Sequence, residues 1–181
     1  RAAKSKDDVA RVMGQSFGGV GRSFFSAFVN DDSKNPDYYT LYMGQSGLGL
    51  SDRELYLQEK FAPQKARYQQ YVAEMLGLAG WANADKAAAD IVALETQIAN
   101  AHWTRAESRN RDKTYNPMTL ADLQTQAPGF PWATFMTAAG IAKADKAVVS
   151  QNTAFPKIAR IFADADLGTL KAWQAFHTTD Q

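Results

Sequence analysis

The stretch YMGQSGLGLSDRELYL, residues 42–57, separates two kinds of sequence pattern and so decides the fold. Before it, the chain has the pattern of a short helix and a β-hairpin; after it, nearly every segment has apolar residues at helical spacing. Gly44, Gly47 and Gly49 allow backbone angles that other residues avoid. Leu48 and Leu50 alternate with these glycines, and each needs a hydrophobic core to enter. The stretch therefore predicts a tight turn that leads from strand to helix.

The second half of this stretch predicts the start of a helix. Ser51 precedes Glu54 by three residues, which is the spacing of a capping box. A phosphate-binding loop is the alternative interpretation of the glycines. However, no Gly-Lys-Ser/Thr follows them, and their spacing does not match G-x-G-x-x-G. We therefore interpret the segment as a structural turn.

The segments upstream of the turn predict one helix and one hairpin. Ser5 is placed to cap the helix, which we expect to end at Gly18 and Gly19. Residues 24–29 and 38–43 are short apolar runs rich in aromatic residues, and a turn-rich linker, residues 30–37, lies between them. Two such runs around a linker indicate an antiparallel hairpin at about residues 24–43. We expect no central sheet of four or more strands.

The segments downstream of the turn predict five or more helices, which makes the fold class mainly α, a helical domain with one small antiparallel β-hairpin near the N-terminus. Thr119 and Asp122 have the spacing of a helix cap. The expected helices lie at about residues 63–79, 83–106, 132–139, 154–163 and from 167 onward, with residues 147–150 as one short strand.

Composition and charge exclude several classes of protein. The 181 residues are 45% hydrophobic, which is enough for one domain with its own core. The net charge of +1 argues against nucleic acid or an anionic membrane surface as a partner. Because the chain has no cysteine, disulfides, thiolate metal sites and cysteine nucleophiles are excluded. No segment is apolar for long enough to form a membrane segment, and the lack of an initiating Met predicts a piece of a longer protein.

The histidines do not predict a catalytic zinc site within this chain. Such a site uses about three protein ligands and a base, whereas the two histidines, His102 and His177, lie outside any His-Glu-x-x-His motif. Glu95 lies two helical turns before His102 on one stripe, and we interpret this pair as part of a structural network. Ser46 lacks the G-x-S-x-G spacing of a serine hydrolase, and no spacing singles out a pair of carboxylates.

A charged segment, residues 104–113, has two interpretations. It contains four cations and two carboxylates, and the simpler interpretation is a solvated loop whose salt bridges stabilise little. The functional interpretation is that Arg105, Arg109 and Arg111 hold a carboxylate on a partner domain or a peptide. We favour the simpler interpretation.

Several long motifs resemble the neprilysin and endothelin-converting-enzyme family of zinc metallopeptidases. Residues 44–57 resemble the family signature GQSGLGLPDRDYYL, and residues 94–103, LETQIANAHW, resemble part of its long central helix. Residues 109–123 are similar to a further run, RxxRDxxKTYNxMTLAEL, and residues 32–37 are similar to its DDKNPD connector. The positions that carry the first motif as structural residues are Gly44, Gln45, Gly47, Gly49, Asp52 and Arg53.

The resemblance covers nearly the whole chain and implies a role for it. It implies that residues 1–181 are a single domain, a fragment of the N-terminal helical domain of a larger peptidase of bacterial type, without the catalytic zinc domain. In the family, the two domains enclose a cavity that admits only small peptides. The chain would then be a non-catalytic cap of a metalloendopeptidase. Its partners would be the missing catalytic domain and, in the parent, small peptide substrates, with Arg105, Arg109 and Arg111 as candidate interdomain or cavity-facing residues.

The resemblance places the cofactor outside this chain. Zinc belongs to the parent enzyme, because the family's zinc ligands, catalytic Glu and Asn-Ala-Tyr segment lie beyond the region covered here. The resemblance also implies an exported parent, either periplasmic, secreted or membrane-anchored. Two alternatives stay open: a stand-alone helical module that binds proteins or peptides without enzymatic activity, and a complete small enzyme of another type. A His-Glu-x-x-His motif downstream in the parent reading frame would separate the cap from the stand-alone module.

Overall fold

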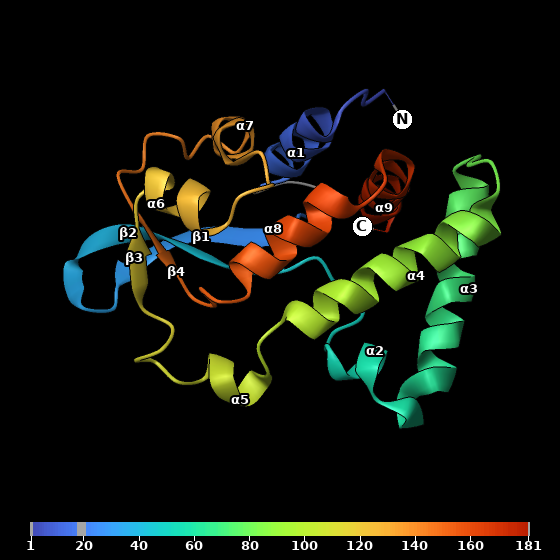
Figure 1. Ribbon diagram of the computed structural model, residues 1–181, viewed down its shortest axis with the longest axis horizontal. Coiled ribbons are helices and arrows are strands. Elements are labelled where there is room, and N and C mark those ends of the chain that lie inside the picture. Colours follow the sequence, from blue (N-terminus) through green and yellow to red (C-terminus); the bar gives the residue numbers. More distant parts are fainter. Residues whose placement is uncertain (1, 18–20, 181) are drawn as a thin grey trace.

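A four-stranded sheet forms one end of the molecule, and helices form the rest (Figure 1). The computed structural model describes residues 2–17 and 21–180. Helix accounts for 53% of the structure and strand for 14%, which confirms the predicted mainly α class. In Figure 1, two long helices, α3 (Ala62–Leu78) and α4 (Ala84–Ala101), lie opposite the sheet, and α8 (Phe155–Asp164) and α9 (Leu167–Thr179) lie between them and the sheet.

The first two strands form the predicted antiparallel hairpin, β1 (Phe25–Asp32) and β2 (Asn35–Gln45). The expected linker at residues 30–37 is wrong, because the strands continue through most of it and leave a turn of only two residues. The side chain of Asp32 stabilises this turn. Its Oδ1 atom accepts hydrogen bonds from the Lys34 amide at 2.9 Å and from the Tyr115 hydroxyl at 2.8 Å.

Two short strands enlarge the hairpin. β4 (Ala147–Val149), which the sequence predicts, pairs in parallel with β2, and β3 (Asn116–Met118) pairs antiparallel with β4. The order is β1-β2-β4-β3, so the sheet has four strands where the sequence predicts a hairpin. The sequence gives no signal for β3, because it is three residues long and contains Pro117, which suits only an edge strand.

The first helix, α1 (Lys6–Gln15), begins as predicted. Ser5 caps it in a reciprocal capping box with Asp8. The predicted end at Gly18 and Gly19 lies outside the described residues. α1 packs against α7 (Trp132–Ala138), and both lie above the sheet in Figure 1.

The helix after the glycine-rich turn, α2 (Glu54–Leu57), begins later than predicted. The expected cap by Ser51 is wrong, because the Glu54 amide donates instead to Oδ1 of Asp52 at 3.0 Å. A short 3-10 helix, η1 (Glu59–Phe61), then leads into α3.

The long helix predicted over residues 83–106 is two helices. α4 ends at Ala101, where the backbone becomes extended at His102. Thr104 then caps α5 (Arg105–Ser108) through a second capping box with Glu107. Helical spacing alone cannot show this break, because no glycine or proline marks it.

The remaining helices agree with the prediction. Thr119 and Asp122 form the predicted cap of α6 (Leu120–Gln126). The predicted helices at residues 132–139, 154–163 and from 167 onward are α7, α8 and α9.

A buried aromatic cluster joins the sheet to these helices. The ring centroid of Phe25 on β1 lies 4.9 Å from that of Phe130, 4.5 Å from Trp132 and 4.7 Å from Phe155. All four side chains are buried. Burial of each such ring contributes about 1.5–3 kcal/mol, so this cluster positions the hairpin firmly against the helical body.

Gly47 and Gly49 are required in the turn for different reasons. Gly47 has a φ of +96°, a conformation that side chains with a Cβ rarely adopt. At Gly49 the limit is space, because an added Cβ would lie 1.8 Å from the Tyr68 hydroxyl oxygen on α3. The turn therefore depends on one glycine for its backbone and on the other for its packing.

Replacing either glycine with valine should lower stability. We expect Gly47→Val to lower the free energy of unfolding by about 1–3 kcal/mol through backbone strain. Gly49→Val should cost about the same or more, because Tyr68 must move. Urea unfolding followed by circular dichroism measures both changes.

Gly77→Ala on α3 is the matched control. Nothing lies within 4 Å of the Cβ it would gain, so we expect it to raise stability by about 0.5–1 kcal/mol. Valine variants that unfold at the parent's urea concentration would show that the turn needs no glycine.

Candidate functional site

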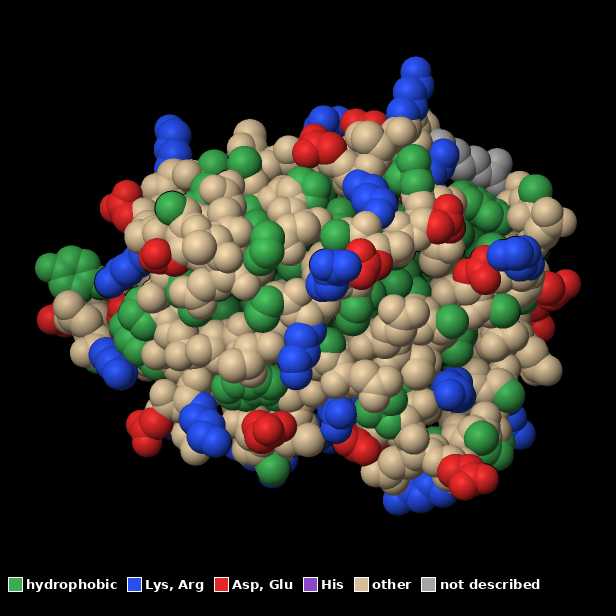
Figure 2. Space-filling model, viewed as in Figure 1, with side chains coloured by type: hydrophobic (Ala, Val, Ile, Leu, Met, Phe, Trp, Pro, Cys, Tyr) green, Lys and Arg blue, Asp and Glu red, His purple; other side chains and the backbone are tan. Residues whose placement is uncertain are grey.

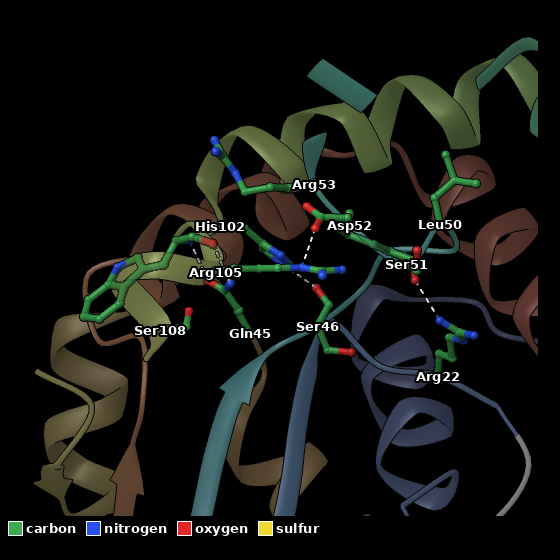
Figure 3. Close-up of a pocket in the computed structure, with 12 residues that line it drawn as sticks. Arg22, Gln45, Ser46, Leu50, Ser51, Asp52, Arg53, His102, Arg105 and Ser108 are labelled. Carbon is green, nitrogen blue, oxygen red and sulfur yellow. Dashed lines mark hydrogen bonds and ion pairs between the residues drawn. The ribbon is translucent and has the colours of Figure 1, made fainter. Parts of the chain in front are cut away.

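A polar pocket lies where β2 ends, between the glycine-rich turn and the segment after α4 (Figure 3). Its volume is about 320 Å³. Four parts of the chain meet there: the segment before β1, the end of β2, the turn itself, and the segment that includes α5. The lining residues are Arg22, Gln45, Ser46, Leu48, Leu50, Ser51, Asp52, Arg53, His102, Trp103, Arg105 and Ser108.

The Tyr56 hydroxyl holds the glycine-rich turn in place. It accepts hydrogen bonds from the Gly49 amide at 3.1 Å and the Leu50 amide at 2.8 Å. It also donates to Oε2 of Glu95 at 2.7 Å. Burial, together with the nearby Glu95 carboxylate, raises the pKa of Tyr56, so the hydroxyl keeps the proton that it donates. The turn is thereby connected to the interior of the helical body.

Glu95 is the centre of a buried hydrogen-bond network. Its side chain is fully buried, and its Oε1 atom accepts from Trp173 Nε1 at 2.9 Å and lies 2.7 Å from His177 Nε2. The pairing of Glu95 with His102 suggested by periodicity is wrong. His177 on α9 takes that place, because α4 and α9 pack together in the fold. The predicted structural role of Glu95 agrees with this geometry.

His102 instead faces the pocket. Its Nε2 atom lies 2.9 Å from the carbonyl oxygen of Ser46, so this nitrogen carries the proton and donates. Burial lowers the pKa of His102 from its usual 6.5 to about 4, with a smaller contribution from the charge of Arg53, while the hydrogen bond to the Ser46 carbonyl acts in the opposite direction. At neutral pH the ring is therefore an uncharged hydrogen-bond donor that ties α4 to the turn.

The three arginines of the pocket have different partners. Arg22 donates from Nη1 to the carbonyl oxygen of Leu48 at 2.8 Å. Arg53 donates from Nε to the carbonyl oxygen of Ala99 at 3.0 Å and pairs with a neighbouring glutamate. Arg105 forms an ion pair with Asp52. Figure 3 shows the Arg105 side chain extending across the pocket, whereas that of Arg53 points away from Arg22.

Some of the residues predicted from the sequence line this pocket, and others lie away from it. Gln45, Asp52, Arg53 and Arg105 line the pocket. Gly44, Gly47 and Gly49 shape the strand end and the turn beside it. Arg109 and Arg111 are exposed outside the pocket, so the three arginines of the charged segment do not form one cluster.

Two pocket residues, Arg22 and Trp103, are not predicted as site residues, although Trp103 ends one of the family motifs. Arg22 is an isolated cation, and its bond to Leu48 spans 26 residues. Trp103 is joined to the end of β2 by paired bonds, in which its amide donates to Gln45 Oε1 at 2.7 Å and its carbonyl oxygen accepts from Gln45 Nε2 at 3.1 Å. Only an alignment of related sequences could have singled out such residues from sequence.

The described residues do not fit a zinc site. Across residues 2–17 and 21–180, no three His, Cys, Asp or Glu side chains group in a way that could hold a metal ion. In the same part of the chain, no helix combines the length and apolar character that crossing a bilayer requires. The pocket offers charged groups and hydrogen-bond donors.

Known proteins share both sequence and fold with this chain. All of residues 1–181 match the model for the N-terminal part of peptidase family M13. Endothelin-converting enzyme 1 of Cavia porcellus is 36% identical over 118 residues, which is 62% of this chain and 16% of that protein. PepO from Lactobacillus rhamnosis HN001 aligns with a TM-score of 0.70 over 97% of this chain and 29% of its own, and its 16% identity shows the fold alone.

The zinc metalloprotease Zmp1 of Mycobacterium tuberculosis has been solved in several states. Its open state and its inhibitor complex each align with a TM-score of 0.90, at 32% and 33% identity, over 98% of this chain and 28% of Zmp1. A partially open state aligns with a TM-score of 0.76 over 98% of this chain and 27% of that one.

The fold is thus that of the N-terminal part of zinc metalloproteases. The chain belongs to peptidase family M13, which confirms the resemblance carried by residues 44–57 and 94–123. It spans less than a third of the length of the relatives named above.

Glu95→Leu should destabilise the fold strongly. The change leaves the buried donors of Tyr56 and Trp173 and the buried ring of His177 without their partner, and each unpaired group costs about 1–3 kcal/mol. We expect a loss of at least about 3 kcal/mol in the free energy of unfolding, measured in urea. The exposed Glu74→Leu on α3 is the control, and an equal effect of both changes would contradict the role of the network.

His102 should make stability depend on pH. Its pKa is lower in the folded chain than in the unfolded chain, so the unfolded chain gains the proton first as the pH falls below 6.5. Stability that is present at pH 7.5 is therefore lost toward pH 4, by about 2 kcal/mol at pH 5. Urea unfolding of His102→Gln, which keeps a donor but cannot titrate, should show a smaller fall between pH 7.5 and pH 5 than the parent. Equal falls in both would contradict this assignment.

Proposed function

We propose that this chain is the non-catalytic cap of a zinc metalloendopeptidase that hydrolyses small peptides. The observation that supports it best is the match of nearly the whole chain to 28% of Zmp1, in a chain whose described residues hold no metal-binding group. A part that is folded like a segment of a zinc protease, but lacks ligands for zinc, suits a role in enclosing the substrate.

The solved states of Zmp1 support an access role. That protease exists in an open state and in an inhibitor complex, and the region like this chain aligns equally well with both. The partially open state aligns less well, with a TM-score of 0.76, so the match to this region differs among the states of that protease. A region whose arrangement differs between states suits a role in controlling entry. On this proposal, residues 1–181 are one domain, a fragment of a larger N-terminal helical domain, and their partner is the catalytic part of the same polypeptide. The zinc belongs to that part, and the complete protein is exported.

Exposed apolar side chains on the hairpin support a partner of this kind. The outer half of the β1–β2 hairpin exposes 60% of Val29, 66% of Tyr38 and 79% of Tyr39. Figure 2 shows hydrophobic side chains at this end of the molecule, where they lie beside acidic and basic ones. Tyr38 and Tyr39 are consecutive in β2, so they point to opposite faces of the hairpin, and both faces carry an exposed aromatic ring. Exposed aromatic rings are well suited to contact another part of a protein.

The decisive experiment compares this chain with the complete polypeptide that contains it. We expect the complete polypeptide to bind zinc stoichiometrically and to cleave short peptides but not folded proteins, whereas the 181-residue chain does neither. Metal analysis and peptidase assays on substrates of increasing length measure this. Zinc-dependent cleavage by the 181 residues alone would overturn the proposal, and a complete polypeptide without a zinc site would favour a stand-alone interaction module.

A second prediction concerns the exposed arginines. In the complete polypeptide, Arg109→Ala combined with Arg111→Ala should leave the unfolding temperature nearly unchanged, because both side chains are exposed. If they face the catalytic part, the double variant should alter turnover or the upper limit of peptide length. Lys157→Ala on α8, which removes another exposed cation, is the control. Identical kinetics for the parent, the double variant and Lys157→Ala would show that Arg109 and Arg111 do not contact the catalytic part.

A further inference from the structure

The pocket holds one guanidinium group more than its carboxylates neutralise. Arg105 pairs with Asp52, and Arg53 pairs with Glu54, which lies just outside the lining. Among the described residues, no carboxylate forms an ion pair with Arg22. Arg22 is also only partly exposed, which weakens the solvation of its charge by water.

Further donors face the same space. Arg22 uses Nη1 for the Leu48 carbonyl, so Nη2 and Nε stay available. The Ser46 and Ser51 side chains also line the pocket, and neither hydroxyl bonds to another described residue. Figure 3 shows Ser51 between the ends of Arg22 and Arg105. Guanidinium and hydroxyl groups that line one pocket can both donate to a carboxylate.

The rest of the pocket lining limits what the ligand can be. The positive charge of Arg22, which no described carboxylate neutralises, disfavours the binding of a cationic ligand. Leu48 and Leu50 supply apolar surface beside the donors, and a volume of about 320 Å³ is larger than one carboxylate needs. A carboxylate on a short aliphatic stem satisfies both parts of the lining.

We propose that this pocket is a binding site for a carboxylate carried on a short aliphatic stem, held between Arg22 and Arg105. The carboxylate can come from two sources, either a small organic acid in solution or an acidic side chain from the rest of the polypeptide. The site does not depend on peptidase activity, so it stands or falls separately from the cap function.

The test uses propionate as the probe and propionamide as its uncharged equivalent. Saturation-transfer NMR titrations are made on the 181-residue chain and on the complete polypeptide. We expect saturable binding of propionate and none of propionamide. Binding to both proteins, or to the complete polypeptide alone, assigns the site to a small acid. Binding to the 181-residue chain alone shows that an acidic side chain fills the pocket in the complete protein. Binding to neither overturns the proposal.

The variants locate the site. Arg105→Gln should weaken propionate binding by roughly tenfold or more, because it removes a charge-assisted hydrogen bond. Arg22→Gln should do the same, and circular dichroism checks its folding, since Arg22 also holds the turn. Arg111→Gln makes the same change of charge outside the pocket and should leave binding unaltered. Equal binding by Arg105→Gln and the parent would show that propionate binds elsewhere and would overturn the assignment.

Discussion

The structure depends on the fully buried carboxylate of Glu95 on α4. Burying a charged group is costly unless hydrogen bonds satisfy it, and here the Tyr56 hydroxyl, the Trp173 indole and the His177 ring lie within bonding distance. These partners come from α2 and α9, so the requirement to satisfy one side chain fixes how three helices meet. Tyr56 extends the constraint outward, because its hydroxyl also accepts the amides of the glycine-rich turn.

The pocket is a consequence of this arrangement. Once the turn is held by Tyr56, the Leu48 carbonyl faces Arg22 and the Ser46 carbonyl faces His102. The side chain of Gln45 joins the end of β2 to the backbone of Trp103 by two hydrogen bonds, so the far side of the pocket is equally well fixed. The rigid interior thus shapes a surface whose polar groups do not all find partners within the chain. This combination is typical of binding sites, whose donors are positioned before the ligand arrives.

The two surfaces that stand out differ in chemistry and in position. The outer hairpin exposes Val29, Tyr38 and Tyr39 among polar residues and lies at the sheet end of the molecule, whereas the pocket is cationic and lies at the other end of β2. The net charge of the whole chain is only +1, so it does not reveal that the pocket is locally cationic. A part of a protease that packs against a partner and also encloses substrate would need surfaces of both kinds, which is consistent with the proposed cap function.

The sequence by itself determined the features that depend on neighbouring residues. The caps at Ser5 and Thr119, the hairpin and the family motifs could all be read from it, because each rests on a pattern within a few residues. Only the tertiary structure decided that Glu95 meets His177, which is 82 residues away, and that Arg22 enters the pocket. Such contacts leave no local pattern, because they arise from how helices and strands pack and not from the spacing within any one of them.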